Sequence, residues 1–231
     1  MSLIYKTLHI ISKTNLLNIS GTYITFQYIH KMELTMTSLI VFIVIVLLIA
    51  VFAVSIYNKL VTLRNRFKNS FAQIEVQLKR RYDLIPNLVS TAKGYMEHEK
   101  ETFERVIQAR NQAISGLKAA SDAPDSDAAI NQLAQAEGML QNALSKLNVV
   151  VEAYPELKAN ETMTQLQEEL TSTENKVAFA RQAFNDAVTS YNTYKQTFPP
   201  VLFANMFGFQ DGKLLDFADS EAIQEAPKVE F

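Results

Sequence analysis

An unbroken run of apolar residues from Leu39 to Val54 dominates the first part of the chain. The wider stretch from Thr35 to Asn58 carries no charged residue. A helix that crosses a bilayer needs about 20 predominantly apolar residues to cover roughly 30 Å of hydrocarbon. The run is rich in β-branched residues, but strands rarely run so long, so its length favours a helix. We therefore predict a transmembrane helix over residues 36–57.

A cleaved signal peptide is the alternative interpretation of this run, since Ala53-Val54-Ser55 resembles a small-residue cleavage site. The apolar core is longer than the roughly 7–15 residues usual in such a signal, which favours the anchor. Residues 1–34 lack helical or strand periodicity, and Met32 and Met36 stand just before the run. We predict that residues 1–35 are an over-extended start. Mass spectrometry of the mature N-terminus tests this.

From Tyr57 onward, apolar residues recur every three or four positions, which is the spacing of one face of an α-helix. The first stripe consists of Leu60, Leu63, Phe67, Phe71, Ile74, Leu78 and Tyr82. It is followed by Asp83-Leu84-Ile85-Pro86-Asn87. A residue before proline is biased away from the α region, and Asp83 could cap a new helix with Pro86 in its first turn. We predict a tight turn or sharp kink here, and a second helix from Pro86 to Ala120.

Similar stripes predict the remaining helices. The second consists of Leu88, Ala92, Tyr95, Met96, Phe103, Val106, Arg110, Ile114 and Leu117, and it ends in a polar loop, residues 121–127, with good N-cap candidates. The third consists of Leu133, Leu140, Leu144, Leu147, Val151 and Tyr154. The fourth consists of Met163, Leu166, Leu170, Thr173, Val177, Ala180, Phe184, Ala187, Tyr191, Tyr194 and Phe198, before two prolines. Short connections favour antiparallel neighbours, so we predict an all-α protein in which the anchor continues into an antiparallel bundle of about four long helices over residues 58–198.

Residues 199–231 form an aromatic-rich tail that we expect to be irregular. It contains Phe203, Met206, Phe207, Phe209 and Phe217, and it closes with Pro227-Lys228-Val229-Glu230-Phe231. Two interpretations are open: the tail packs back along the bundle and covers apolar surface, or it is a docking peptide for a partner or the membrane surface. We favour the first.

Composition and motifs narrow the function. The net charge is −2 and cysteine is absent, which disfavours nucleic-acid binding and removes thiolate chemistry and cysteine-based zinc sites. The helical region holds one histidine, His98, between two glutamates, and this is more typical of a solvated face than of a metal ligand. Glycine patterns for nucleotide binding and a serine nucleophile motif are both missing. We expect no catalysis, no metal and no cofactor.

A polar cluster around the predicted turn supplies the candidate site. It comprises Gln77, Lys79, Arg80, Arg81, Asp83, Pro86 and Asn87. One interpretation is structural: Arg80 or Arg81 pairs with Asp83 or with helix C-terminal carbonyls and fixes the turn. The other is a basic end presented to a partner or to phosphate. We favour the structural role.

The chain from about residue 36 onward resembles the LemA family of bacterial membrane proteins. The resemblance is carried by Tyr57-Asn58-Lys59-Leu60-Val61, by the stretch from Val76 to Val89, by Tyr154-Pro155-Glu156-Leu157-Lys158, and by the closing five residues. It implies a single-pass membrane protein with a long helical domain, without an accepted enzymatic activity. Some relatives take part in building magnetosome membranes, and members are often encoded near membrane metalloproteases.

These features predict a membrane-anchored helical scaffold or adaptor of the bacterial cell envelope. Its expected partners are the membrane, an unidentified envelope protein with a membrane metalloprotease as one candidate, and a second copy of the chain. The alternative is a metal-binding or ligand-sensing bundle that acts through a partner. Basic residues after the span, Lys59, Arg64, Arg66 and Lys68, outnumber those before it, which predicts a cytoplasmic C-terminal domain in the inner membrane.

Overall fold

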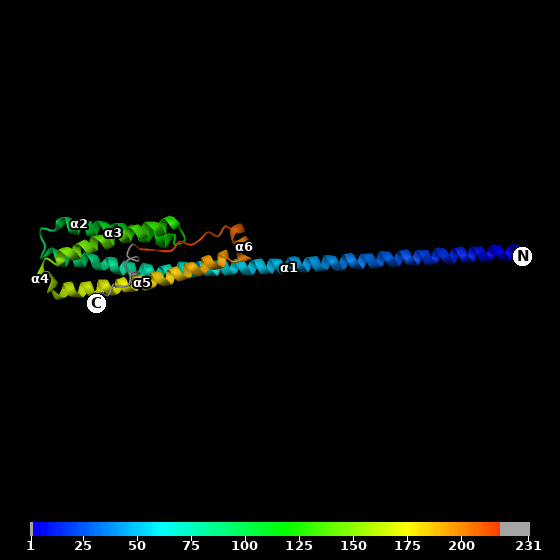
Figure 1. The fold of residues 1–231 in the computed structure, drawn as a ribbon, viewed down its shortest axis with the longest axis horizontal. Coiled ribbons are helices and arrows are strands. Elements are labelled where there is room, and N and C mark those ends of the chain that lie inside the picture. The colour runs from blue at the N-terminus through cyan, green and yellow to red at the C-terminus, as the bar shows by residue number, and fades with distance from the viewer. Residues whose placement is uncertain (1, 218–231) are drawn as a thin grey trace, which may run out of the picture. The chain divides into compact units, whose positions relative to one another are not determined.

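A computed structural model describes the backbone of residues 2–217 and the side chains of Tyr28 and residues 30–217. All regular elements in this part of the chain are α-helices, so the all-α prediction is confirmed. They are α1 (Ser2–Lys93), α2 (Lys100–Asp122), α3 (Asp127–Val151), α4 (Pro155–Lys158), α5 (Glu161–Gln196) and α6 (Pro200–Met206) (Figure 1). The chain divides into two compact units, Met1–Ser55 and Ile56–Phe231, and α1 contributes backbone to both.

The first unit is helical throughout its described backbone, including the leader in which the sequence lacks periodicity. Every large apolar side chain from Leu39 to Val54 is exposed. A helix that is apolar all round and unburied meets the requirement for a membrane span in length and composition. The predicted start at Met32 or Met36 stays a prediction.

The core of the second unit begins along the apolar stripe of α1, whose predicted members from Leu60 to Tyr82 are all buried. Aromatic side chains join this stripe to α5. The Phe67 ring lies 5.3 Å from that of Tyr191 and 6.2 Å from that of Phe184, and Phe71 lies 5.6 Å from Phe184. Because these pairs run in opposite chain directions, α5 is antiparallel to this part of α1, as short connections predict.

The α2–α3 hairpin covers another side of α1 within the same unit (Figure 1). Ser126 caps α3 by accepting a hydrogen bond from the Ala129 amide at 3.4 Å, which confirms the predicted cap. In the hairpin loop, Asp125 accepts hydrogen bonds from Arg64 and Lys68 of α1. Burial alone would raise the pKa of Asp125, but these two cations outweigh it and leave the pKa below its ordinary value.

The tight turn predicted at Pro86 and the second helix predicted from Pro86 to Ala120 are wrong. Pro86 lies inside α1, which continues to Lys93, and the chain turns at residues 94–99 instead. Asp83 is an exposed mid-helix residue and not a cap. Proline removes one hydrogen-bond donor from a helix, and the buried side chains of Ile85 and Leu88 carry the apolar stripe across it, so packing outweighs the local preference.

We expected the whole tail to be irregular, but residues 200–206 form α6. Beyond α6, residues 209–217 have no regular secondary structure and pack back along the bundle, as the interpretation favoured from sequence predicts for the tail. Asn192 holds Gly212 on both sides: its Oδ1 accepts from the Gly212 amide at 2.8 Å, and its Nδ2 donates to the Gly212 carbonyl at 2.9 Å. Asn185, one heptad earlier on α5, binds Leu215 in the same way. The closing Pro227–Phe231 motif lies outside the described residues.

Candidate functional site

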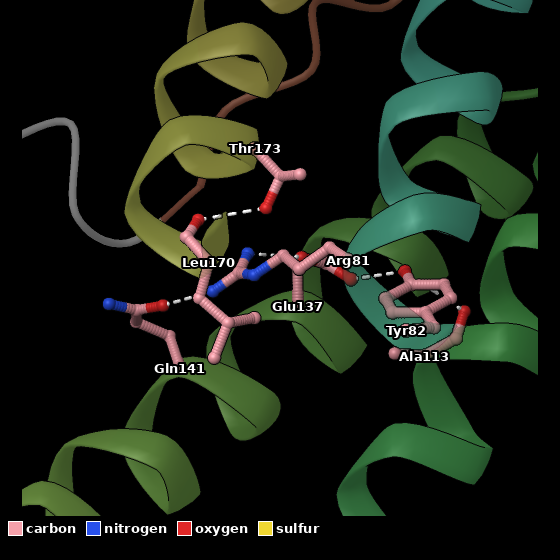
Figure 2. A network of polar contacts seen from close by, with 7 residues as sticks. All are labelled: Arg81, Tyr82, Ala113, Glu137, Gln141, Leu170 and Thr173. Atoms are coloured by element: carbon pink, nitrogen blue, oxygen red, sulfur yellow. Dashed lines mark hydrogen bonds and ion pairs between the residues drawn. The ribbon is translucent and has the colours of Figure 1, made fainter. Parts of the chain in front are cut away.

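A buried ion pair joins α1 to α3. Arg81 and Glu137 are only 5% and 2% exposed, and Arg81 Nη1 donates to Glu137 Oε2 at 3.1 Å. Figure 2 shows the same guanidinium reaching Gln141, to which Nη2 donates. Removing two charges from water is costly unless their remaining hydrogen-bonding capacity is also used. Gln141 uses part of it for Arg81.

Tyr82, the next residue along α1, completes the cluster. Its hydroxyl donates to Glu137 Oε1, so both carboxylate oxygens of Glu137 accept hydrogen bonds from α1. Burial raises the pKa of Tyr82 far above its ordinary value, and the negative charge of Glu137 adds to the effect. The phenol therefore remains a neutral donor at physiological pH. We refer to Arg81, Tyr82, Glu137 and Gln141 as the Arg81 cluster.

A side chain from α2 is tied to the same turn of α1. Arg110 Nε donates to the Tyr82 backbone carbonyl at 2.6 Å. In a regular helix this carbonyl would accept from the amide of the residue four positions later, and that residue is Pro86, which has no amide hydrogen. Arg110 thus supplies the hydrogen-bond donor that proline removes. It also links the turn of α1 between Tyr82 and Pro86 to the α2–α3 hairpin.

The Arg81 cluster borders a cleft of about 360 Å³ between α1, α3, α4 and α5. Arg81 and Gln141 form part of its wall, and Lys158 and Glu174 contribute opposite charges. On the α5 side, the buried Thr173 hydroxyl donates to the carbonyl of Leu170, so it is satisfied within its own helix (Figure 2). The cleft is large enough for a small polar molecule. In the described residues no group of three or more potential metal ligands gathers.

Of the residues predicted for the site, the structure brings only Arg81 into the cluster. Lys79 is exposed and pairs with Glu75 one turn earlier on α1. Arg80, Asp83 and Asn87 are exposed, Pro86 is half-buried, and the side-chain oxygen of Gln77 is buried without a hydrogen-bond partner among the described residues. Arg81 has a structural role, but not the expected one: its partners are Glu137 and Gln141, not Asp83 or helix C-terminal carbonyls, and α1 has no turn here to fix. Burial on the α3-facing side of α1 selects Glu137 instead.

Sequence reasoning missed Tyr82, Arg110, Glu137 and Gln141 as members of one site. A usable signal was present in the apolar spacing. Glu137 lies four residues after Leu133 and three before Leu140, so a charged residue occupies a position of the α3 stripe. Arg81 and Arg110 occupy stripe positions on α1 and α2 in the same way. Charges at core positions on several helices indicate buried partners.

Geometry and sequence together define a class: a helical bundle with a buried polar cluster, carried on a chain with one apolar helix near its N-terminus. Residues 70–231 match the model described as LemA family, which is more than half of the chain, so the protein belongs to the LemA family. This confirms the resemblance seen in the sequence.

Curated relatives include two magnetosome proteins. The chain is 24% identical over 169 residues to magnetosome protein MamQ of Magnetospirillum gryphiswaldense and 25% identical over 169 residues to MamQ 2 of Paramagnetospirillum magneticum. Each alignment covers 67% of this chain and 62% of the relative. Protein LemA of Metamycoplasma hominis is 24% identical over 141 residues, with 61% of this chain and 60% of that protein covered. The chain therefore spans less than two thirds of the length of these relatives.

The apolar helix, which is long and apolar enough to cross a membrane, indicates a membrane-associated helical protein.

Proposed function

We propose that this protein is a membrane-anchored, non-enzymatic helical scaffold or adaptor of the cell envelope that organises or supports membrane protein complexes. The observation that carries the proposal is the exposed apolar surface of α1 from Leu39 to Val54, on the same chain as a bundle that buries its own core. The apolar surface needs lipid to cover it, and the bundle offers a long, structured surface to which a partner can bind.

A groove along the α2–α3 hairpin gives this surface a place for a protein partner. Its volume is about 730 Å³. Its lining combines apolar side chains such as Ile107 and Met139 with several uncharged amides such as Gln108, and with one residue of each charge, Lys93 and Glu104. Such a lining suits another protein surface, since amides adapt to donors or acceptors while the apolar groups bury area. An envelope protein is the partner we propose, with a membrane metalloprotease or a second copy of this chain as candidates.

Site-specific photocrosslinking in membranes tests this function. A photoreactive residue at Met139, which lies in the groove, should yield a discrete crosslinked membrane complex. The matched control is Val149, which is exposed on the same helix and does not line the groove. Equal crosslinking from both positions, or extraction of the full chain from membranes by alkaline carbonate, would contradict the proposal.

The cleft beside Arg81 favours a second candidate, a ligand-sensing bundle that acts through a partner. Thermal unfolding of the full chain with and without candidate solutes separates the two functions. A binder of small polar molecules gains melting temperature by mass action, whereas a scaffold is indifferent to them. Metal analysis of the purified chain examines the metal-binding bundle, the other alternative from the sequence.

We also propose that the C-terminal unit is cytoplasmic, because basic residues concentrate after the span. The chain has no cysteine, so a single introduced cysteine reports its side of the membrane without background. Thr193→Cys, at an exposed position on α5, should resist a membrane-impermeant maleimide in intact cells and react after lysis. Labelling in intact cells would reverse the orientation.

A further inference from the structure

The helical turn that follows α5 exposes apolar side chains that the bundle does not use. Phe198 is 79% exposed, Leu202 61%, Met206 67% and Phe207 46%. Leu202 and Met206 are four residues apart on α6 and therefore share a face. Large apolar side chains gathered at one end of a fold mark a contact site, whereas apolar residues scattered singly over a surface do not.

The same segment carries no charge. From Thr197 to Gln210 there is neither an acidic residue nor a lysine, arginine or histidine. The charged residues that flank the segment in the sequence pair with each other: Lys195 of α5, which is buried, lies 2.8 Å from the carboxylate of Asp211, whose side chain is 60% exposed. A protein-facing rim is usually polar, whereas a surface that enters lipid must lack unpaired charge.

Contacts inside the second unit fix this segment beside Tyr57. The Tyr57 ring lies 5.2 Å from Phe207 and 5.6 Å from Phe209, both edge-on. Tyr57 follows Val54, the last residue of the apolar run, by three residues, or about 4.5 Å of helix rise. Tyrosine is enriched where hydrocarbon meets headgroups, and the first basic residue, Lys59, follows two positions later.

We propose that α6 and its flanking aromatic residues form a second membrane contact, a lipid-facing surface that inserts into the boundary between headgroups and acyl chains. The surface consists of Phe198, Leu202, Met206 and Phe207. The contact with Tyr57, which follows the apolar run by three residues in the sequence, and the absence of charge from residues 197–210 assign the surface to lipid and not to a protein partner. The contact would hold the base of the bundle against the bilayer at two points. The inference rests on the proposed membrane anchor.

Tryptophan fluorescence tests it cleanly, since the chain contains no tryptophan. Single variants Leu202→Trp and Met206→Trp in the full chain are reconstituted in phosphatidylcholine vesicles whose lipids are brominated close to the headgroup end of the acyl chains. Both should show blue-shifted emission and strong loss of fluorescence to the brominated lipid, with little loss to aqueous acrylamide. Phe179→Trp is the matched control, because Phe179 is 74% exposed on α5 and lies outside the proposed surface.

Val46→Trp, at the middle of the apolar run, is measured in vesicles whose lipids are brominated near the methyl end of the acyl chains, and it separates this inference from the anchor itself. If lipid quenches Val46→Trp while Leu202→Trp and Met206→Trp stay accessible to acrylamide, the anchor stands and the second contact is wrong, which leaves the surface for a protein partner. If lipid quenches none of the three variants Val46→Trp, Leu202→Trp and Met206→Trp, the anchor and the second contact are both wrong. Quenching of Phe179→Trp equal to that of Leu202→Trp also overturns the inference. Circular dichroism of each variant verifies that the helices are retained.

Discussion

Arg110 Nε donates a 2.6 Å hydrogen bond to the backbone carbonyl of Tyr82, the carbonyl that Pro86 leaves without its helical donor. One side chain from α2 thereby allows α1 to continue through a proline. Because Tyr82 also donates to Glu137 of α3, a single turn of α1 is bonded to both helices of the hairpin. This relationship explains why the chain remains helical where its local sequence predicts a break.

Replacement of Arg110 should therefore lower the free energy of unfolding more when Pro86 is present than when it is replaced. Arg110→Met should lower the free energy of unfolding by about 1.5–3 kcal/mol, since it removes a charge-assisted hydrogen bond to a half-buried carbonyl. In a Pro86→Ala background, the restored amide can donate to Tyr82 and the cost should shrink. Urea unfolding of the full chain in detergent, followed by circular dichroism, measures both values. Equal costs in the two backgrounds would mean that Arg110 acts elsewhere.

Substitutions of the adjacent residues Arg80 and Arg81 should differ sharply in how much stability they cost. Arg81→Met leaves Glu137 buried without its cation and should cost about 3–5 kcal/mol, whereas Arg80→Met, at an exposed position, should stay within about 0.5 kcal/mol. The double variant Arg81→Met with Glu137→Leu should cost less than the two single variants together, because neither charge is then stranded. Thermal melts of the wild-type chain, of Arg80→Met, Arg81→Met and Glu137→Leu, and of the double variant test this. Similar losses for Arg80→Met and Arg81→Met would refute the buried pair.

Tyr82 should make the bundle sensitive to alkali. Its pKa in the folded protein is raised above the ordinary value of 10.0, so this contribution to stability is complete below pH 10 and is lost as the pH rises further. Above that pH the unfolded chain releases the phenolic proton and the folded chain retains it, which costs about 1.4 kcal/mol per pH unit. The Tyr82→Phe variant does not lose stability in this way. It is less stable at neutral pH, because Glu137 then loses one of its hydrogen-bond donors. The stability gap between the two proteins should narrow from pH 10 upward, and a constant gap would count against a buried neutral phenol.

The Asn192 contact should hold the tail in place. Asn192→Ala removes both hydrogen bonds to Gly212, worth together about 1–3 kcal/mol, and should free the backbone beside Lys213, whose side chain is already exposed, for cleavage by trypsin. Asn192→Asp should also weaken the contact, because a carboxylate keeps the acceptor but turns negative oxygen toward the Gly212 carbonyl. Thr193→Ala, exposed on the same helix, is the control. Mass spectrometry of fragments cut after Lys213 gives the rate, and an unchanged rate in Asn192→Ala would show that other contacts hold the tail.

The predictions from sequence that the structure confirms are those that depend on residues within a single helix or loop. The apolar run, the stripe from Leu60 to Tyr82 and the cap at Ser126 each follow from local spacing or local chemistry, and each is present in the structure. Prediction failed at Pro86, because the donor that compensates for proline comes from Arg110, 24 positions further along the chain. A local rule cannot include a partner from another helix.

The sequence by itself determined the helical class, the apolar segment and the faces that must be buried, since each depends on period and length within one segment. Only the tertiary structure decided which faces meet. It paired Arg81 with Glu137 across 56 positions, and it brought Phe207, the residue after α6, beside Tyr57. Such pairings depend on the free energy of whole helices packing together, which no single stretch of the chain contains.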